Sequence, residues 1–292
     1  MKIGLILGGG GEVGIAWELG VLAALKAGTG FGATDCAVVV GTSAGAYVGA
    51  LTSHGADLDQ LMAAATTGPG LSPTPVDIDP DAPVDPGRGS SVIPDDIAAL
   101  MVSFPGTVEE RAVAIGKLAL TAPTALDGAQ FVGLAGAMLG VDTWPEVDFR
   151  PTSVNAETGA TVLWSRRSGV GLVPAVASSF AIPGFFPPVE INGGHYIDVP
   201  RARFTEDLVR EASLDAIVYV GLVLPVLVNT DELATLEVLA EKGMPIATIT
   251  NGPEFNEIAD DLMNPAVRAR AAVLGQEDGH RAAARVRELL GG

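Results

Sequence analysis

Short apolar runs, separated by glycine turns and amphipathic stretches, predict alternating strands and helices in the first fifty residues. Residues 2–7 and 37–40 read as buried strands, because each is a compact run of aliphatic side chains. Residues 15–26 carry an apolar stripe at helical spacing, and residues 44–51 have the small and aliphatic side chains of a helix packed closely on a sheet. The pattern predicts two consecutive strand–turn–helix units.

Later apolar segments extend the predicted sheet. Residues 150–155 and 161–165 predict a hairpin joined through Glu157-Thr158-Gly159, and residues 216–224 and 245–250 predict further buried strands. Helices that alternate with apolar strands favour an α/β fold, a three-layer α/β/α sandwich with a central, mostly parallel sheet.

The middle of the chain changes in composition. Residues 69–94 are rich in proline, glycine and aspartate and predict an irregular excursion over the surface. Helical patterns follow over 95–101, 107–120 and 130–139, the second opening with the capping box Thr107-x-x-Glu110. We expect residues 95–140 to form a cap-like helical insertion within a single domain over residues 1–292.

Charge and cysteine content narrow the possible partners. The 35 acidic residues outnumber the 17 basic ones, and the formal charge of −18 disfavours nucleic acid and weakens attraction to anionic bilayers. The single cysteine, Cys36, cannot form an internal disulfide and is expected in the core.

No segment of the sequence predicts a membrane span. The N-terminal apolar run is short and ends in glycines without a processing site, so we interpret it as a strand and not a signal peptide. The apolar stretch over 216–228 is interrupted by Pro225 and is shorter than the ~20 residues that a spanning helix needs. We expect a cytoplasmic protein with, at most, peripheral membrane contact.

Four glycines, Gly8 to Gly11, follow the first predicted strand and open the first helix. Such a turn can aim backbone N–H groups at an oxyanion. The spacing Gly9-x-Gly11-x-x-Gly14 also fits a dinucleotide-binding turn, but the second strand is then expected to end in an acidic residue, and Gly41-Thr42-Ser43 follows it instead. The alternative is a tight turn that binds no ligand, although such a turn does not require four successive glycines, which lose much conformational entropy on folding.

A second motif, Gly41-Thr42-Ser43-Ala44-Gly45, follows the second predicted strand. A serine in such a strand-to-helix turn has an exposed hydroxyl in the positive field of the helix N-terminus, which suits a nucleophile. Many serines in G-x-S-x-G patterns are only turn residues or helix caps. The two motifs together predict a serine hydrolase.

A serine nucleophile requires a base, and the chain has three histidines. His54 follows the serine too closely for the usual order of a hydrolase triad, and His280 lies in a charged helical tail. His195 precedes Tyr196-Ile197-Asp198 in a predicted strand. A triad is therefore disfavoured, and His195 and His280 are its candidates.

Together these segments resemble the patatin-like phospholipase family, which has a glycine-rich block, a G-x-S-x-G block and a distant catalytic aspartate in this order. Residues 177–188, Ala-Ser-Ser-Phe-Ala-Ile-Pro-Gly-Phe-Phe-Pro-Pro, are similar to the family's lead-in to that aspartate, and Asp198 then takes its position. The resemblance covers residues 3–52 and 151–210.

The resemblance implies a Ser–Asp dyad that hydrolyses lipid or other acyl esters through an acyl-enzyme, with no metal and no organic cofactor. Ser43 is then the nucleophile, Asp198 the base, and the amides of Gly9, Gly10 and Gly11 the oxyanion hole.

Substrate-binding residues are less defined. An aromatic group is a candidate lining for an acyl channel, with core packing as the alternative, and an arginine group is a candidate for an anionic head group, with a solvated helix face as the alternative. The aromatic group is Phe180, Phe185 and Phe186, and the arginine group is Arg268, Arg270, Arg281, Arg285 and Arg287.

Two positions depart from the family pattern. Family members usually carry a cation where this chain has Val13, and usually glycine or alanine where Val199 follows the aspartate, here with Pro200 next. A positive φ after the aspartate would strain a valine. These departures keep open a second hypothesis, a catalytically impaired relative that binds a lipid or a partner.

Overall fold

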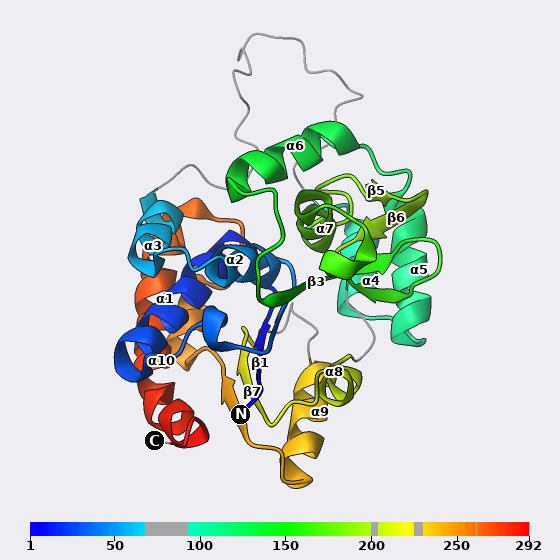
Figure 1. Ribbon diagram of the computed structural model, residues 1–292. Helices are drawn as coiled ribbons and strands as arrows, with labels where there is room; N and C mark the ends of the chain where they lie inside the picture. Colours follow the sequence, from blue (N-terminus) through cyan, green and yellow to red (C-terminus); the bar gives the residue numbers. More distant parts are fainter. Residues whose placement is uncertain (68–92, 200–203, 225–229, 261, 292) are drawn as a thin grey trace.

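The computed structural model describes residues 1–67, 93–199, 204–224, 230–260 and 262–291. Within them, eight strands form one sheet in the order β5-β6-β3-β2-β1-β7-β8, and β4 pairs with β3 outside this path (Figure 1). The strands are β1 (Ile3–Leu7), β2 (Val38–Gly41), β3 (Asp148–Asn155), β4 (Thr161–Leu163), β5 (Val189–Ile191), β6 (Gly194–Ile197), β7 (Ala216–Val220) and β8 (Ile246–Ile249).

The sheet is parallel through its centre and antiparallel at one edge. Neighbours along β3-β2-β1-β7-β8 are parallel, whereas β4 and β6 pair antiparallel with β3, and β5 with β6. The central strands are buried on both faces, which is why they read as continuous apolar runs.

Helices cover both faces of this sheet. The helices are α1 (Gly11–Thr29), α2 (Ala44–Ser53), α3 (Leu58–Thr67), α4 (Asp95–Val102), α5 (Val108–Ala119), α6 (Gly128–Leu139), α7 (Leu172–Ser179), α8 (Thr205–Ala212), α9 (Thr230–Glu241) and α10 (Arg268–Leu289). Alternate side chains of β1 enter two cores, because Leu5 and Leu7 pack with residues of α1 and α10 while Ile6 packs with residues of α8 and α9. The predicted three-layer α/β/α sandwich is confirmed.

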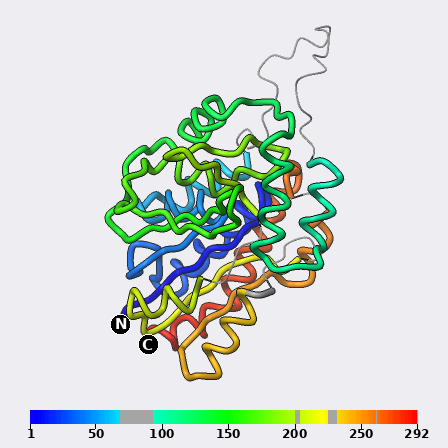
Figure 2. Tube along the Cα trace, turned by 90° about the vertical axis from the view of Figure 1, so that its right-hand side faces the viewer, coloured from blue at the N-terminus to red at the C-terminus, as the bar shows by residue number. Residues whose placement is uncertain are grey.

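The strand directions show at which end of the sheet the glycine turn and Ser43 lie. The two ends of the chain lie at the same end of the molecule in both views (Figure 1 and Figure 2). Strand β1 starts there and its parallel neighbours run with it, so their carboxyl ends lie at the opposite end of the sheet. The glycine turn and Ser43 follow β1 and β2 at that end.

Most predicted elements are present. The hairpin is β3 and β4, and the helices predicted over 107–120 and 130–139 are α5 and α6. The capping box of α5 is confirmed, since the Glu110 amide donates to Thr107 Oγ1 at 3.1 Å and the Thr107 amide to Glu110 Oε2 at 2.8 Å. The strand predicted over 216–224 is shorter, because the chain leaves the sheet after Val220 at Gly221.

The region predicted as a cap has two different environments. Helices α4 and α5 pack at the antiparallel edge, where Ile97 and Ile115 share a cluster with Val154. Helix α6 packs against α7 and faces the pocket described below. The excursion predicted over 69–94 lies outside the described residues except for positions 93 and 94. No helix in the described part of the chain is long and apolar enough to span a membrane.

Candidate active site

Ser43 lies in a sharp turn between β2 and α2. Its backbone has φ 52° and ψ −117°, a conformation that non-glycine residues rarely adopt. The turn is held by its neighbours, because the Ser43 amide donates to Ser179 Oγ at 3.0 Å and the Gly45 amide donates to the Gly8 carbonyl at 2.9 Å. Strain maintained in this way is typical of functional turns.

Small residues let this turn sit directly on the sheet. A Cβ atom at Gly45 would lie 2.5 Å from the Leu7 carbonyl oxygen, so only glycine allows α2 to start so close to β1. The neighbouring Thr42 hydroxyl bonds that of Thr152 on β3 at 2.8 Å, and both threonines are buried. The start of α2 is therefore fixed against two strands.

The glycine turn approaches the same serine. The Gly8 amide donates to the Val220 carbonyl at 2.9 Å, the Gly14 amide donates to the Gly10 carbonyl at 2.7 Å, and Gly11 has a positive φ of 60°. A Cβ atom at Gly9 would lie 3.5 Å from Ser43 Cβ. Across the described part of the chain, no backbone carbonyl accepts a hydrogen bond from the amides of Gly9, Gly10 or Gly11. These amides therefore have no backbone acceptor in the described part of the chain.

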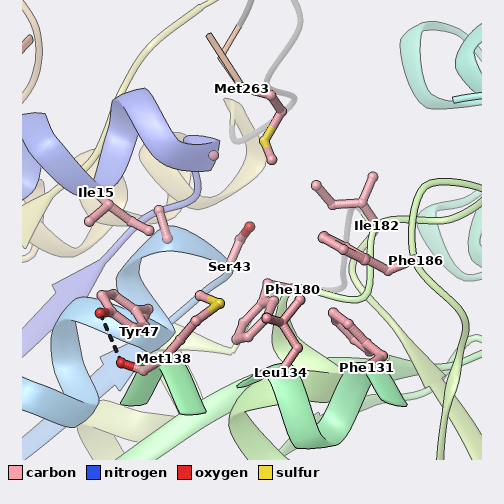
Figure 3. A pocket seen from close by; sticks show the side chains of 12 residues that line it. Ile15, Ser43, Tyr47, Phe131, Leu134, Met138, Phe180, Ile182, Phe186 and Met263 are labelled. Atoms are coloured by element: carbon pink, nitrogen blue, oxygen red, sulfur yellow. Dashed lines mark hydrogen bonds between the residues drawn. The ribbon is translucent and has the colours of Figure 1, made fainter. Parts of the chain in front are cut away.

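The Ser43 hydroxyl points into a pocket with an apolar lining (Figure 3). Helix α6 contributes Phe131, Leu134 and Met138, whose spacing places them on one face of the helix. Tyr47 lies on the same side, and its hydroxyl donates to the Met138 carbonyl at 3.3 Å. The segment after α7 contributes Phe180, Ile182 and Phe186 (Figure 3).

An aromatic cluster closes one side of this pocket. Phe131 is fully buried, stacks on Phe186 with ring centroids 4.4 Å apart, and meets Phe180 edge-on at 5.6 Å. Phe185 packs behind Phe186 at 4.7 Å and is not part of the lining. All three phenylalanines belong to the buried core, and Phe180 and Phe186 also line the pocket, whereas Phe185 does not.

Asp198 follows β6, at the antiparallel edge of the sheet, and is half-buried. Its amide donates to the Ala181 carbonyl at 3.0 Å, which ties it to the segment that carries Phe180 and Ile182. The residue predicted as the base is thus joined by one hydrogen bond to a wall of the pocket.

Comparison with known proteins identifies a family resemblance in part of the chain. The family model described as Patatin-like phospholipase matches residues 91–198, a segment that ends at Asp198. Over this segment the chain is similar to the patatin-like phospholipase family. Members of this family are typically lipid acyl hydrolases. No curated protein matches the sequence.

One solved structure supports the similarity in fold. The structure of VipD from Legionella pneumophila is similar with a TM-score of 0.51 and 16% identity, over 97% of this chain and 67% of that one. The type III effector ExoU has a TM-score of 0.40 and 15% identity, over 99% of this chain and 53% of that one. The structure of ExoU from Pseudomonas aeruginosa in complex with SpcU has a TM-score of 0.44 and 17% identity, over 100% of this chain and 53% of that one. The chain therefore spans about half the length of ExoU.

The valine that follows Asp198 in this patatin-like chain is not strained. Val199 is buried, and the non-glycine residues with positive φ in the described part of the chain are Ser43, Asn192 and Ser213. Pro200 lies outside the described residues. The conflict expected from a positive φ after Asp198 does not arise at Val199.

The three histidines do not line the pocket. His195 Nδ1 lies 2.6 Å from Glu157 Oε1, and although partial burial raises the pKa of Glu157, the hydrogen bonds with His195 hold it below its ordinary value. His54 Nε2 bonds the Thr143 carbonyl at 2.9 Å, and His280 is exposed on α10. The pocket lining contains no histidine in the described part of the chain, which counts against a triad.

Where patatin-like relatives usually carry a cation, Val13 is fully buried and its amide donates to the Leu262 carbonyl at 3.0 Å. A guanidinium nevertheless lies beside this turn, because Arg268 Nη1 is 3.5 Å from Glu12 Oε2. Other members of the predicted arginine group are engaged elsewhere, Arg285 with the Ile246 carbonyl and Arg287 with the Gly28 carbonyl. The group does not line the pocket.

A buried acid that the sequence analysis did not identify lies beneath the glycine turn. Glu18 on α1 is 1% exposed, and its carboxyl oxygens have no hydrogen-bond partner among the described side chains and backbone groups. Burial raises the pKa of Glu18 well above its ordinary value, and the nearby Gly8 backbone opposes this only in part. This shift favours the protonated, neutral form of the carboxyl group. No group of three or more potential metal ligands occurs in the described part of the chain.

Proposed function

We propose that this protein is a serine acyl ester hydrolase that acts on lipid or other acyl esters. The observation that carries the proposal is the position of Ser43, on a positive-φ turn between the glycine loop and an apolar pocket. Such a position exposes the hydroxyl to a bound acyl group and places amide donors beside it.

In the proposed mechanism, Asp198 accepts the Ser43 proton while the hydroxyl oxygen attacks the ester carbonyl. The amides of Gly9, Gly10 and Gly11 stabilise the resulting oxyanion. Asp198 returns this proton to the alcohol oxygen as the ester bond breaks and the acyl-enzyme forms. It then accepts a proton from the water that attacks the acyl-enzyme, and gives that proton to Ser43 Oγ as the carboxylic acid leaves. An ordinary aspartate is a weak base, so this mechanism requires surroundings that raise the basicity of Asp198.

The pocket supports an acyl chain as the part of the substrate that is bound. Its walls are apolar apart from Ser43 and Tyr47. We further propose that residues 1–292 act as one domain in which residues 95–140 are a helical cap, with α6 as its substrate-facing part. Contact with a membrane would be peripheral.

Ester hydrolysis by purified protein tests this proposal. Ser43→Ala is expected to lower the turnover of a short nitrophenyl ester by at least about 10³-fold, because no other group supplies the attacking oxygen. Ser53→Ala is the matched control, since Ser53 is a buried serine of the same helix whose hydroxyl lies outside the pocket lining. Equal turnover in wild type and Ser43→Ala would remove Ser43 as the nucleophile.

The alternative is a patatin-like protein that binds a lipid or a partner without turning it over. The proline two residues after Asp198, Pro200, departs from the resembled family's pattern and motivates this alternative. Saturable binding of a fatty acid, without hydrolysis of any ester and without labelling of Ser43 by a fluorophosphonate, would support this alternative.

A further inference from the structure

A buried ion pair lies at the first turn of α1, directly after the glycine loop. Arg268, the first residue of α10, places Nη1 3.5 Å from Oε2 of Glu12, the second residue of α1. The side chains are 9% and 1% exposed, so both charges are largely removed from water. Charges in such surroundings act on their neighbours more strongly than surface charges do.

The position of Glu12 matters for the electrostatics of the loop. The positive end of the dipole of a 19-residue helix lies at the N-terminus of α1, where an oxyanion bound by the glycine amides would benefit from it. A carboxylate in the same turn opposes that benefit, because it repels a negative charge that develops nearby. A cation beside Glu12 removes this opposition.

The segment that carries Arg268 already contacts the loop at other points. The Leu262 carbonyl accepts a hydrogen bond from the Val13 amide at 3.0 Å, and a Cβ atom at Gly11 would lie 2.7 Å from the same oxygen. Met263 lines the pocket opposite the aromatic cluster (Figure 3). The C-terminal part of the chain therefore forms one side of the candidate site.

We propose that Arg268 is a positioning residue that compensates the charge of Glu12, so that the field of the glycine loop is available to the oxyanion. This inference rests on the proposed hydrolase function. It makes a prediction that a purely structural ion pair does not make, namely that removing Arg268 alone is far more harmful to turnover than removing Glu12 alone.

A double-mutant cycle on nitrophenyl butyrate hydrolysis tests the proposal. Arg268→Met is expected to lower kcat by about tenfold or more with KM within about twofold, because the penalty falls on the transition state. The double variant Glu12→Gln/Arg268→Met is expected to recover to within about threefold of the wild-type kcat, and Glu12→Gln alone to stay above about half of it.

Further variants keep the test decisive if Arg268→Met folds poorly. Arg268→Lys retains the charge and is expected to keep kcat within about threefold of wild type. Arg285→Met is the control, because Arg285 lies on the same helix and bonds the Ile246 carbonyl away from the loop. Thermal unfolding of each variant shows whether the fold is intact.

Two results would overturn the proposal. If kcat falls as far in the double variant as in Arg268→Met, or if Glu12→Gln and Arg268→Met lower kcat equally, the pair has only a structural role. Fluorophosphonate labelling of Ser43 separates this from failure of the proposed function. If wild type is labelled and either of these results is obtained, only the proposal of charge compensation fails. If wild type is neither labelled nor active, the proposed function and the charge compensation both fail.

Discussion

At the residue scale, the backbone of Ser43 is the feature that most constrains the chemistry. A serine held at φ 52° is stable only because its amide, the Gly45 amide and the neighbouring glycines are all fixed. The sequence could predict that Ser43 and Gly9 to Gly11 lie in turns between a strand and a helix, since the spacing of glycine and serine is visible without a structure. It could not predict that Arg268 is buried against Glu12, because a charged residue in a helical tail usually lies in solvent.

Replacement of the proposed base gives the first residue-scale prediction. Asp198→Asn is expected to lower kcat of ester hydrolysis by at least about 10²-fold, because the amide cannot accept the Ser43 proton. His195→Ala and His280→Ala are the controls, expected to stay within about twofold of wild type. Loss of activity with either histidine variant and retained activity in Asp198→Asn would instead support a triad.

Glu18 gives a prediction for stability against pH. Because burial raises its pKa in the folded protein, the folded state keeps a proton that the unfolded chain releases above its ordinary pKa of about 4.3. As pH rises from this value toward the pKa of Glu18 in the folded protein, the free energy of unfolding of the wild type therefore falls relative to that of Glu18→Gln. The fall is about 1.4 kcal/mol for each pH unit.

Urea unfolding of both proteins at pH 5, 6, 7 and 8 measures this difference. Glu190→Gln provides a control, because Glu190 is exposed on β5. A difference between wild type and Glu18→Gln that stays constant across this range would show that Glu18 is ionised in the folded protein.

At the element scale, strong periodicity and clear termini made most helices predictable. Helix α3 was not predicted although the sequence carries its signals. Leu58, Leu61, Met62 and Ala65 form a partly buried stripe at helical spacing, and the Gln60 amide donates to Asp57 Oδ1 at the start of the helix. Helix α7 is the opposite case, because six of its eight residues are buried and it has a proline at position 174, so it lacks the alternation of polar and apolar faces. Helices α8 and α9 were also not predicted.

The contact between α2 and β1 gives an element-scale prediction. Gly45→Ala is expected to destabilise the protein by about 1–3 kcal/mol and to lower turnover, because its Cβ would meet the backbone oxygens of Leu7 and Gly8. Gly133→Ala is the matched control, since Gly133 is exposed on α6 with open space around it, and a gain of about 0.5–1 kcal/mol is expected there. Chemical denaturation measures both, and equal stability changes would refute the close approach.

The apolar face of α6 predicts a limit on the acyl chain. Phe131→Leu is expected to move the preferred length of nitrophenyl esters toward longer acyl chains, by about two methylene groups, because the aromatic wall of the pocket recedes.

Phe255→Leu is the control for that experiment. Phe255 lies in the short helix η3 (Pro253–Ile258), is equally buried and packs on Trp17 outside the pocket lining, so its loss costs stability without a change of preference. An unchanged length profile in Phe131→Leu would exclude Phe131 as the end of the acyl site.

At the scale of the whole molecule, the fold follows from two-sided burial of the central strands. Continuous apolar runs in β1, β2 and β7 predict helices on both faces, and both cores are present. The pocket was less predictable, since it combines α6, the segment after α7 and Met263 from distant parts of the sequence. The order of these parts in space depends on the strand crossovers, which hydrophobic patterning does not specify.

The central claim is that Ser43 is an activated nucleophile, and covalent labelling tests it most directly. Purified wild type, Ser43→Ala and Ser53→Ala are treated with a fluorophosphonate, and the adduct is located by peptide mass spectrometry. We expect an adduct on Ser43 in wild type and in Ser53→Ala, and none in Ser43→Ala. A folded wild-type protein that remains unlabelled, or that is labelled equally after Ser43→Ala, would contradict the claim.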